Sequence, residues 1–252
     1  MSIYQRLLNS KSRYGGGFLL LLDPDRIEQR EYLRLAEAAQ ECRVDGILVG
    51  SSFVLKSNFA QAVQAIKEVT DLPVIIFPGS ITQITHHADA ILFTSLLSGR
   101  NPTYLIDEQV KGAPLIKQAG LEPIPTGYLL IESGNLTSVQ YMSGCTPIPN
   151  SKYEIAAAHA LAAQYLGMKF VYLEAGSGAR TPVQVEMIRE VASYASIPII
   201  VGGGLHSPEA VAARIDAGAS LVVVGNHFEN DARLTHLREL VAAAHPIQSV
   251  NV

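Results

Sequence analysis

The sequence of 252 residues predicts an α/β fold in which eight parallel strands close into a (βα)8, or TIM, barrel within one domain, residues 1–252. Short apolar runs alternate with helix-like stretches along the chain. The runs are continuously apolar, which is typical of parallel strands covered on both faces. Glycines cluster after the last three runs and not after the first. An open, doubly wound sheet would carry its glycine fingerprint after its first strand, so the distribution favours the barrel.

Each predicted strand is an apolar run that ends in polar or glycine-rich residues. The eight runs are 18–22, 46–49, 74–77, 90–93, 124 with 128–131, 170–173, 198–201 and 221–224. The fifth is the weakest, because Pro123 and Pro125 lie in its approach and proline cannot donate to a strand ladder.

Helices are predicted between these strands from amphipathic spacing, caps and breakers. The stretches are 28–42, 58–69, 104–118, 153–166, one starting at Thr181-Pro182, one starting at Ser207-Pro208, and 232–243. The link 80–87 is too short for a full helix. Residues 133–151, rich in Gly, Ser, Thr and Pro, form the longest irregular stretch and are expected to be a lid or a mobile loop.

Composition excludes several classes of protein. An apolar content of 48% with a net charge of -4 excludes disorder. Cys42 and Cys145 are too few for a disulfide framework. The absence of a basic block argues against nucleic-acid binding. The N-terminus lacks a signal-peptide pattern, and its longest apolar run, Phe18–Leu22, is strand-sized, so we expect a soluble cytoplasmic protein without a transmembrane segment.

The chemistry of such a barrel lies at the carboxyl ends of its strands. Three glycine clusters follow strands six, seven and eight: Gly176-Ser177-Gly178, Gly202-Gly203-Gly204 and Gly225-Asn226. Glycine lets backbone N–H groups approach an anion without a Cβ in the way. One such cluster would indicate only a tight turn. Three at consecutive strand ends predict a phosphate site that is held mainly by backbone donors.

Two carboxylate positions stand out at strand ends. Asp23 and Asp25 flank a stiffening proline after the first strand. They are interpreted as candidate magnesium ligands or, for Asp25 above all, as helix caps. Glu174 precedes the glycine loop of strand six, where it would accept a proton from a substrate hydroxyl or, alternatively, be a surface turn residue. His206 and His227 also follow strands, but a bystander role fits them at least as well.

The strand-end motifs resemble those of the geranylgeranylglyceryl phosphate synthase family, which includes the bacterial PcrB proteins. The resemblance covers about Phe18 to Phe228. It rests on Leu-Leu-Asp-Pro-Asp, Ile-Leu-Val-Gly-Ser-Ser, Tyr-Leu-Glu-Ala-Gly-Ser-Gly, Val-Gly-Gly-Gly-Leu and Val-Gly-Asn, which begin at residues 21, 47, 172, 201 and 224. The string 172–178 with the two later glycine motifs is highly specific.

The resemblance implies a modified (βα)8 barrel in which an extended segment replaces one helix, which the short link before strand four fits. It implies a Mg2+-dependent phosphoglycerol geranylgeranyltransferase. This enzyme joins geranylgeranyl diphosphate to the 3-hydroxyl of sn-glycerol 1-phosphate, giving an ether lipid precursor and diphosphate. Asp23 and Ser52 match the magnesium positions. The glycerol-phosphate positions are matched by Tyr172, Leu173, Glu174, Ala175, Gly176, Ser177, Gly178, Gly203, Gly204, Gly225 and Asn226.

Two departures bear on the prenyl donor. PcrB-type members carry a lysine where this chain has Leu21, which favours the archaeal-like branch and a C20 donor. Where many relatives have lysine after Asp-Pro-Asp, this chain has Arg26, which can keep a phosphate contact with a different geometry. The prenyl tail requires an apolar groove, for which Phe77, Leu96, Tyr104 and Tyr128 are candidate linings.

The alternatives are the same reaction with a polyprenyl diphosphate of another length, another phosphate-handling barrel enzyme such as an isomerase or lyase, and a non-catalytic barrel that binds a phosphate ligand. Members of the archaeal-like branch assemble as dimers or hexamers, so a homo-oligomer is expected. Transient membrane contact through the prenyl chain is compatible with this function.

Overall fold

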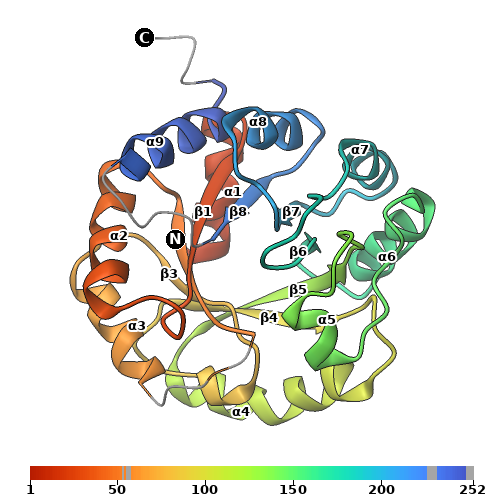
Figure 1. Ribbon diagram of the computed structural model, residues 1–252. Helices are drawn as coiled ribbons and strands as arrows, with labels where there is room; N and C mark the ends of the chain where they lie inside the picture. The colour runs from red at the N-terminus through yellow and green to blue at the C-terminus, as the bar shows by residue number, and fades with distance from the viewer. Residues whose placement is uncertain (53, 55–57, 226–231, 248–252) are drawn as a thin grey trace.

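The protein is a closed barrel of eight parallel strands in chain order (Figure 1). The computed structural model describes residues 1–52, 54, 58–225 and 232–247. The strands are β1 (Gly17–Leu22), β2 (Gly46–Val49), β3 (Val74–Ile76), β4 (Ala90–Leu96), β5 (Glu122–Leu130), β6 (Phe170–Glu174), β7 (Ile199–Gly202) and β8 (Leu221–Val224). Because β1 pairs with both β2 and β8, the sheet has no free edge. The predicted barrel is confirmed.

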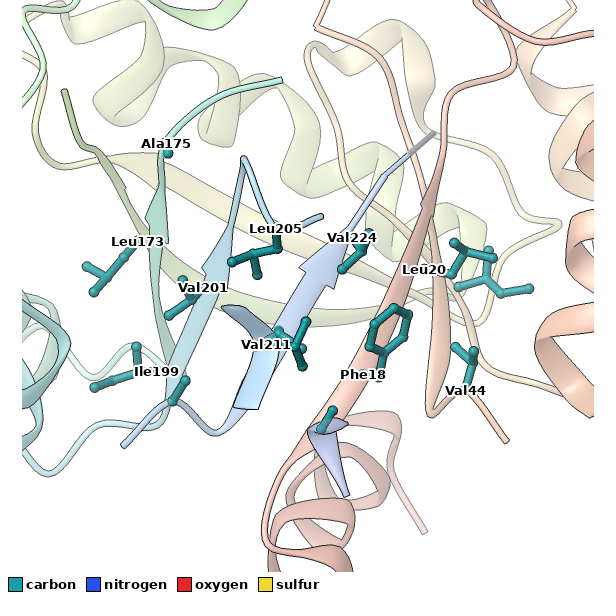
Figure 2. Close-up of a cluster of buried hydrophobic side chains, with 14 of the residues drawn as sticks. Phe18, Leu20, Val44, Leu173, Ala175, Ile199, Val201, Leu205, Val211 and Val224 are labelled. Atoms are coloured by element: carbon teal, nitrogen blue, oxygen red, sulfur yellow. The ribbon is translucent and has the colours of Figure 1, made fainter. Parts of the chain in front are cut away.

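Helices form a ring around the barrel (Figure 1). They are α2 (Gln29–Glu41), α3 (Phe59–Glu68), α4 (Glu108–Ala119), α6 (Tyr153–Tyr165), α7 (Val185–Tyr194), α8 (Pro208–Asp216) and α9 (Ala232–Ala244). Alternate residues along each strand pack in two different cores, one inside the barrel and one between the sheet and the helices. Leu19 points into the barrel, whereas Phe18 and Leu20 pack in the layer between sheet and helices (Figure 2). Both faces are therefore buried, which explains the continuously apolar runs.

The link between β3 and β4 contains only one 3-10 turn, η1 (Ile81–Gln83). Its N-cap, Ser80, accepts a hydrogen bond from the amide of Thr82. A full helix is therefore missing from this position in the outer ring, as the short link predicted. The space that the helix would fill lies beside α4.

The fifth strand differs from its prediction, because β5 runs unbroken through both prolines. In a parallel ladder the odd-numbered residues of β5 face β6, as shown by the hydrogen bond from the Lys169 amide to the Pro125 carbonyl (2.8 Å). The β5–β6 register begins only at Thr126 opposite Phe170. The missing N–H groups of Pro123 and Pro125 thus point where no strand pairs, and they cost the ladder nothing.

Helical boundaries differ from the predictions in three places. Residues 133–151 contain a short helix, α5 (Ser138–Ser143), with Thr137 as its N-cap. The fourth helix begins as a π-helical turn, η2 (Thr103–Asp107), before α4. The helix expected from Thr181-Pro182 begins instead at Val185. Its entry stays extended because the carbonyl of Val183 accepts two hydrogen bonds from the guanidinium of Arg214 (3.1 and 3.2 Å).

An N-terminal helix that the sequence reading missed, α1 (Ile3–Tyr14), closes the amino-terminal end of the barrel. In Figure 1 it lies within the ring of outer helices, beside β1 and β8. Leu7 is fully buried among the interior side chains, and the Tyr4 ring meets Phe170 edge-on at 5.2 Å. The helical spacing of Ile3, Leu7 and Leu8 was the available signal. Its charged neighbours concealed it.

Glu122 at the start of β5 holds the first turn of α1. Its carboxylate accepts hydrogen bonds from the backbone amides of Ile3 (2.6 Å) and Tyr4 (3.0 Å). We expect Glu122→Ala to lower the free energy of unfolding by about 1.5–3 kcal/mol, because two helix N-terminal donors lose a charged acceptor. Denaturant unfolding measures this. Glu190→Ala, at an exposed position of α7, is the matched control, and an equal loss in both variants would contradict the role of Glu122.

Among the described helices, none has the length and apolar character needed to cross a bilayer.

Candidate active site

The strand-end residues meet in one cavity of about 740 Å³ at the carboxyl ends of the barrel strands. Asp23 and Ser52 line it on one side. From β6, β7 and β8 it is lined by Tyr172, Glu174, Gly176, Ser177, Gly178, Gly203, Gly204 and Gly225. The two halves of the predicted site therefore share one space. Asn226 and His227 lie outside the described residues. Glu132, the acid at the end of β5, is exposed and does not line the cavity.

Four glycines form the β6–β7 wall in left-handed backbone conformations. Their φ angles are 96° at Gly176, 73° at Gly178, 87° at Gly203 and 72° at Gly204. A Cβ on Gly203 would lie 2.7 Å from both the Glu174 Oε1 atom and the Gly176 amide nitrogen. Only glycine allows both the positive φ angle and the lack of room for a Cβ. The β6 and β7 loops can therefore pack directly against each other, with their backbones forming the cavity wall.

Glu174 is a buried carboxylate at the head of this wall. It is 6% exposed and accepts a hydrogen bond from the Gly176 amide (2.6 Å). Burial raises the pKa of Glu174, while the neighbouring Tyr172 hydroxyl and the Gly176 amide oppose the shift. That hydroxyl has no hydrogen bond of regular geometry with any described residue. The position of Glu174 excludes the alternative of a surface turn residue.

Two residues of the predicted glycerol-phosphate segment 172–178 have side chains that point away from the cavity. The side chains of Leu173 and Ala175 are fully buried in the layer between sheet and helices (Figure 2). Their contribution to a ligand is therefore limited to the main chain. The amide of Ala175 donates to the carbonyl of Gly202 (3.0 Å), which fixes the β6 and β7 loops relative to each other.

Asp23 is a buried carboxylate on the β1 side of the cavity. It is 8% exposed and accepts a hydrogen bond from the Asp25 amide (3.0 Å). The Arg26 Nε atom forms an ion pair with it at 3.3 Å. Burial raises the pKa of Asp23, and the Asp25 amide, the Ser51 hydroxyl and Arg26 oppose the shift. Of the two alternatives for Asp25, the capping role is excluded, because α2 begins at Gln29 with Glu28 as its N-cap.

Gln83 joins the loops that follow β2 and β3 by hydrogen bonds. No sequence motif had singled it out. Its side chain is 1% exposed, donates to the Ser51 carbonyl (3.1 Å) and accepts the Gly79 amide. A Cβ on Gly50 would overlap the Phe77 carbonyl oxygen. These close contacts fix the loop that carries Ser51 and Ser52, and the Ser51 hydroxyl hydrogen-bonds to Asp23. In the sequence, Gln83 is only one of several polar residues in a short link, and its burial depends on the loops that the closed barrel brings together.

The cavity continues as an apolar groove beneath α4, in the space left by the missing helix. This part is lined mainly by Ile81, Ile84, Ile91, Phe93, Gly112 and Ile116. The four residues named as tail linings, Phe77, Leu96, Tyr104 and Tyr128, also line the cavity. From α5, Met142 accepts a hydrogen bond at its carbonyl from the Tyr104 hydroxyl (3.1 Å). The irregular stretch 133–151 therefore forms part of the groove wall.

Among the described residues, no three His, Cys, Asp or Glu side chains gather where they could hold a metal ion. Mg2+ needs fewer protein ligands, typically one or two carboxylates with substrate phosphate oxygens and water. Asp23 presents a buried carboxylate to the cavity, and Ser52 lines the same side. These hard oxygen ligands fit Mg2+ that is held jointly with a bound phosphate.

Fold and site together define a barrel enzyme in which one cavity joins a glycine wall, two buried carboxylates and an apolar groove. The model of the PcrB family matches residues 8–244, and the chain belongs to this family. A geranylgeranylglyceryl phosphate synthase from Chitinophaga pinensis is 43% identical over 96% of both chains. One from Korarchaeum cryptofilum is 44% identical over 89% of this chain and 92% of its own.

A solved structure agrees with these relatives. The crystal structure of (S)-3-O-geranylgeranylglyceryl phosphate synthase from Thermoplasma acidophilum, in complex with substrate sn-glycerol-1-phosphate, has a TM-score of 0.92 and 38% identity. The match covers 98% of this chain and 99% of that one. The barrel fold and the family expected from the motifs are confirmed, and with them prenyl transfer as the class of reaction.

Proposed function

We propose that the protein transfers the geranylgeranyl group of geranylgeranyl diphosphate to the 3-hydroxyl of sn-glycerol 1-phosphate, releasing diphosphate. One observation carries the proposal: a single cavity joins the Asp23 carboxylate, the glycine wall with Glu174 and an apolar groove. The substrate named for the Thermoplasma acidophilum relative supports the choice of acceptor. The relatives' shared name supports the choice of donor.

The acceptor's phosphate binds to backbone amides of the β6, β7 and β8 loops. The Gly176 amide already donates to Glu174, whereas Gly203 and Gly204 line the cavity with no side chain of their own to cover the neighbouring amides. Anchoring the phosphate there aims the far hydroxyl at the reacting carbon, which lowers the entropy cost of the encounter. Glu174 then accepts the hydroxyl proton at its carboxylate as the new ether bond forms.

The donor's diphosphate binds on the opposite side, where Asp23 and Ser52 would hold Mg2+ and Arg26 adds positive charge at the cavity. Bound Mg2+ supplies neutralisation of the diphosphate, which makes it a better leaving group. The prenyl tail lies in the apolar groove beneath α4. Leu21 in place of a lysine supports the C20 donor.

A transfer assay tests the function. Purified protein is incubated with radiolabelled geranylgeranyl diphosphate and sn-glycerol 1-phosphate, with and without EDTA, and label is followed into the acceptor. We expect transfer that EDTA abolishes and Mg2+ restores. Unchanged turnover in EDTA would reject the metal role. Tight glycerol-phosphate binding by calorimetry, without turnover by donors of any length, would favour a non-catalytic binding barrel.

Asp23→Asn is expected to raise the Mg2+ concentration for half-maximal activity by roughly tenfold or more, because a charged contact worth about 1.5–3 kcal/mol is lost. A magnesium titration of the transfer rate measures it. Asp216→Asn, at the exposed end of α8, is the control and keeps the wild-type titration. An unaltered curve for Asp23→Asn would show that the ligand assignment is wrong.

The acid limb of the pH profile follows from Glu174. Burial raises the pKa of Glu174, and only the ionised carboxylate accepts a proton. We therefore expect kcat/KM to fall as pH is lowered through this pKa, at a higher pH than a solvent-exposed glutamate would give. Rates across a pH series, with Glu174→Gln as the comparison, measure it. An identical acid limb in the variant would assign the limb to another group.

A cytoplasmic location and a homo-oligomeric state of two or six chains stay predictions of the sequence. Size-exclusion chromatography with light scattering tests the second.

A further inference from the structure

Three aromatic rings form a continuous wall in the cavity. Phe77, directly after β3, stacks on Tyr172 of β6 with ring centroids 5.3 Å apart and an interplanar angle of 19°. Tyr128 of β5 meets Tyr172 edge-on at 5.4 Å and lies 5.8 Å from Phe77. Tyr128 and Tyr172 are register partners in the β5–β6 ladder, which sets them side by side. We call these three residues the aromatic wall.

The ring of Phe77 is the member presented to a ligand. Tyr172 is fully buried behind it and Tyr128 is 8% exposed. Phe77 is half-buried, and one of its faces is covered by Tyr172 while its open surface lines the cavity. Because the two rings stack, packing against the fully buried Tyr172 sets the orientation of the Phe77 ring.

The aromatic wall lies where the reaction takes place. Around the barrel it spans from β3, the neighbour of the strand that leads to Ser52, to β6, which carries Glu174. Tyr172 precedes Glu174 by two residues on the same face of β6. A Cβ on Gly202 would contact the Tyr172 hydroxyl and lie 2.9 Å from the Glu174 Oε2 atom, so the two side chains adjoin.

We propose that Phe77 is a further catalytic residue, whose ring stabilises the allylic cation that forms at C1 of the prenyl donor. The inference rests on the proposed prenyl transfer. When the C1–O bond breaks, its electron pair leaves with the diphosphate. The acceptor's hydroxyl oxygen supplies the pair of the new C1–O bond, and its proton passes to Glu174. An aromatic face is electron-rich and attracts the cation without bonding to it.

The two tyrosines support this role without competing for the cation. Burial, followed by the nearby charge of Glu174, raises the pKa of both phenols well above the usual value. They stay protonated at neutral pH and are therefore poor nucleophiles toward a carbocation. The wall also excludes water, which would otherwise capture the cation. A leucine at position 77 would exclude water as well but would offer no electron-rich face.

Site-specific fluorination of Phe77 tests the proposal. Each added fluorine weakens the electron-rich face with little change of shape. Single-turnover transfer rates are measured with phenylalanine and its mono-, di- and trifluoro forms at position 77. We expect the logarithm of the rate to fall stepwise, by about tenfold across the series. Affinity for a thiolo analogue of the donor, which does not ionise, should stay constant. A flat rate series would overturn the proposal.

Phe170 supplies the matched control. It is fully buried in the same barrel interior, at the amino-terminal end against Tyr4. The same fluorinated residues at Phe170 should leave the transfer rate unchanged. An equal decline at both positions would show that fluorine acts through the fold and would overturn the assignment to Phe77.

A fluorinated donor tests the premise of a cation. Fluorine at C2 of the prenyl group destabilises an allylic cation, so the wild-type protein should transfer it far more slowly. An unslowed transfer would mean that no cation forms and would overturn the role of Phe77 while leaving prenyl transfer intact. Absence of transfer by the wild-type protein with any donor would instead reject the proposed function itself.

Discussion

Replacing Glu174 by glutamine is expected to lower kcat by about 100- to 10,000-fold, the range for loss of a positioned proton acceptor. In the native protein, Glu174 accepts a hydrogen bond of 2.6 Å from the Gly176 amide, and the side-chain oxygen of glutamine can accept the same bond. The loop should therefore keep its shape. The dissociation constant for sn-glycerol 1-phosphate, measured by calorimetry, should change far less than kcat.

Glu132→Gln is the matched control for this substitution. Glu132 follows β5 as Glu174 ends β6, but it is exposed and lies outside the cavity. Its replacement should leave both kcat and acceptor affinity at wild-type values. Equal losses of kcat and affinity in Glu174→Gln would contradict proton acceptance and leave only a binding role.

Gly203→Ala is expected to lower kcat/KM by roughly 100-fold or more, since misplacement of reacting groups by about 1 Å can cost that much. The new methyl group would lie 2.7 Å from the Glu174 Oε1 atom and from the Gly176 amide nitrogen. The φ angle of 87° also strains any residue other than glycine. Steady-state kinetics together with a thermal melt separate the loss of activity from the loss of stability.

Gly167→Ala separates backbone strain from the steric clash. Gly167 has a similar φ of 76°, but a Cβ there would meet nothing within 4 Å, and the residue lies in the turn after α6. We expect a small loss of stability and unchanged kcat/KM. If Gly203→Ala behaved in the same way, the close contact between the two loops would have no bearing on the site.

Much of the barrel could be predicted because its determinants are local. Each strand is an apolar run, and each run ends where the chain turns outward at the same rim. Asp23 and Glu174 could therefore be assigned to one site although 150 residues separate them. Strand ends of a closed parallel sheet converge whatever their distance in sequence. The glycine wall followed from the same reasoning.

The features that escaped prediction depend on the tertiary partner. The prolines of β5 looked disruptive because the late start of β6 opposite Thr126 is not visible in the sequence. Likewise, the start of α7 is set by Arg214 of α8, which binds the Val183 carbonyl. Gln83 has no motif at all, and its importance depends on loops that only the closed barrel brings together.

α1 covers the amino-terminal end of the barrel, where Leu7 is fully buried among the interior side chains. Under the proposed function, substrates and products would enter and leave at the opposite end, where the cavity lies. Under the same function, the prenyl chain would occupy the apolar groove beneath α4, apart from the part of the cavity that Arg26 and the glycine loops line. In the proposed reaction the transferred prenyl chain can therefore stay in its groove while diphosphate leaves.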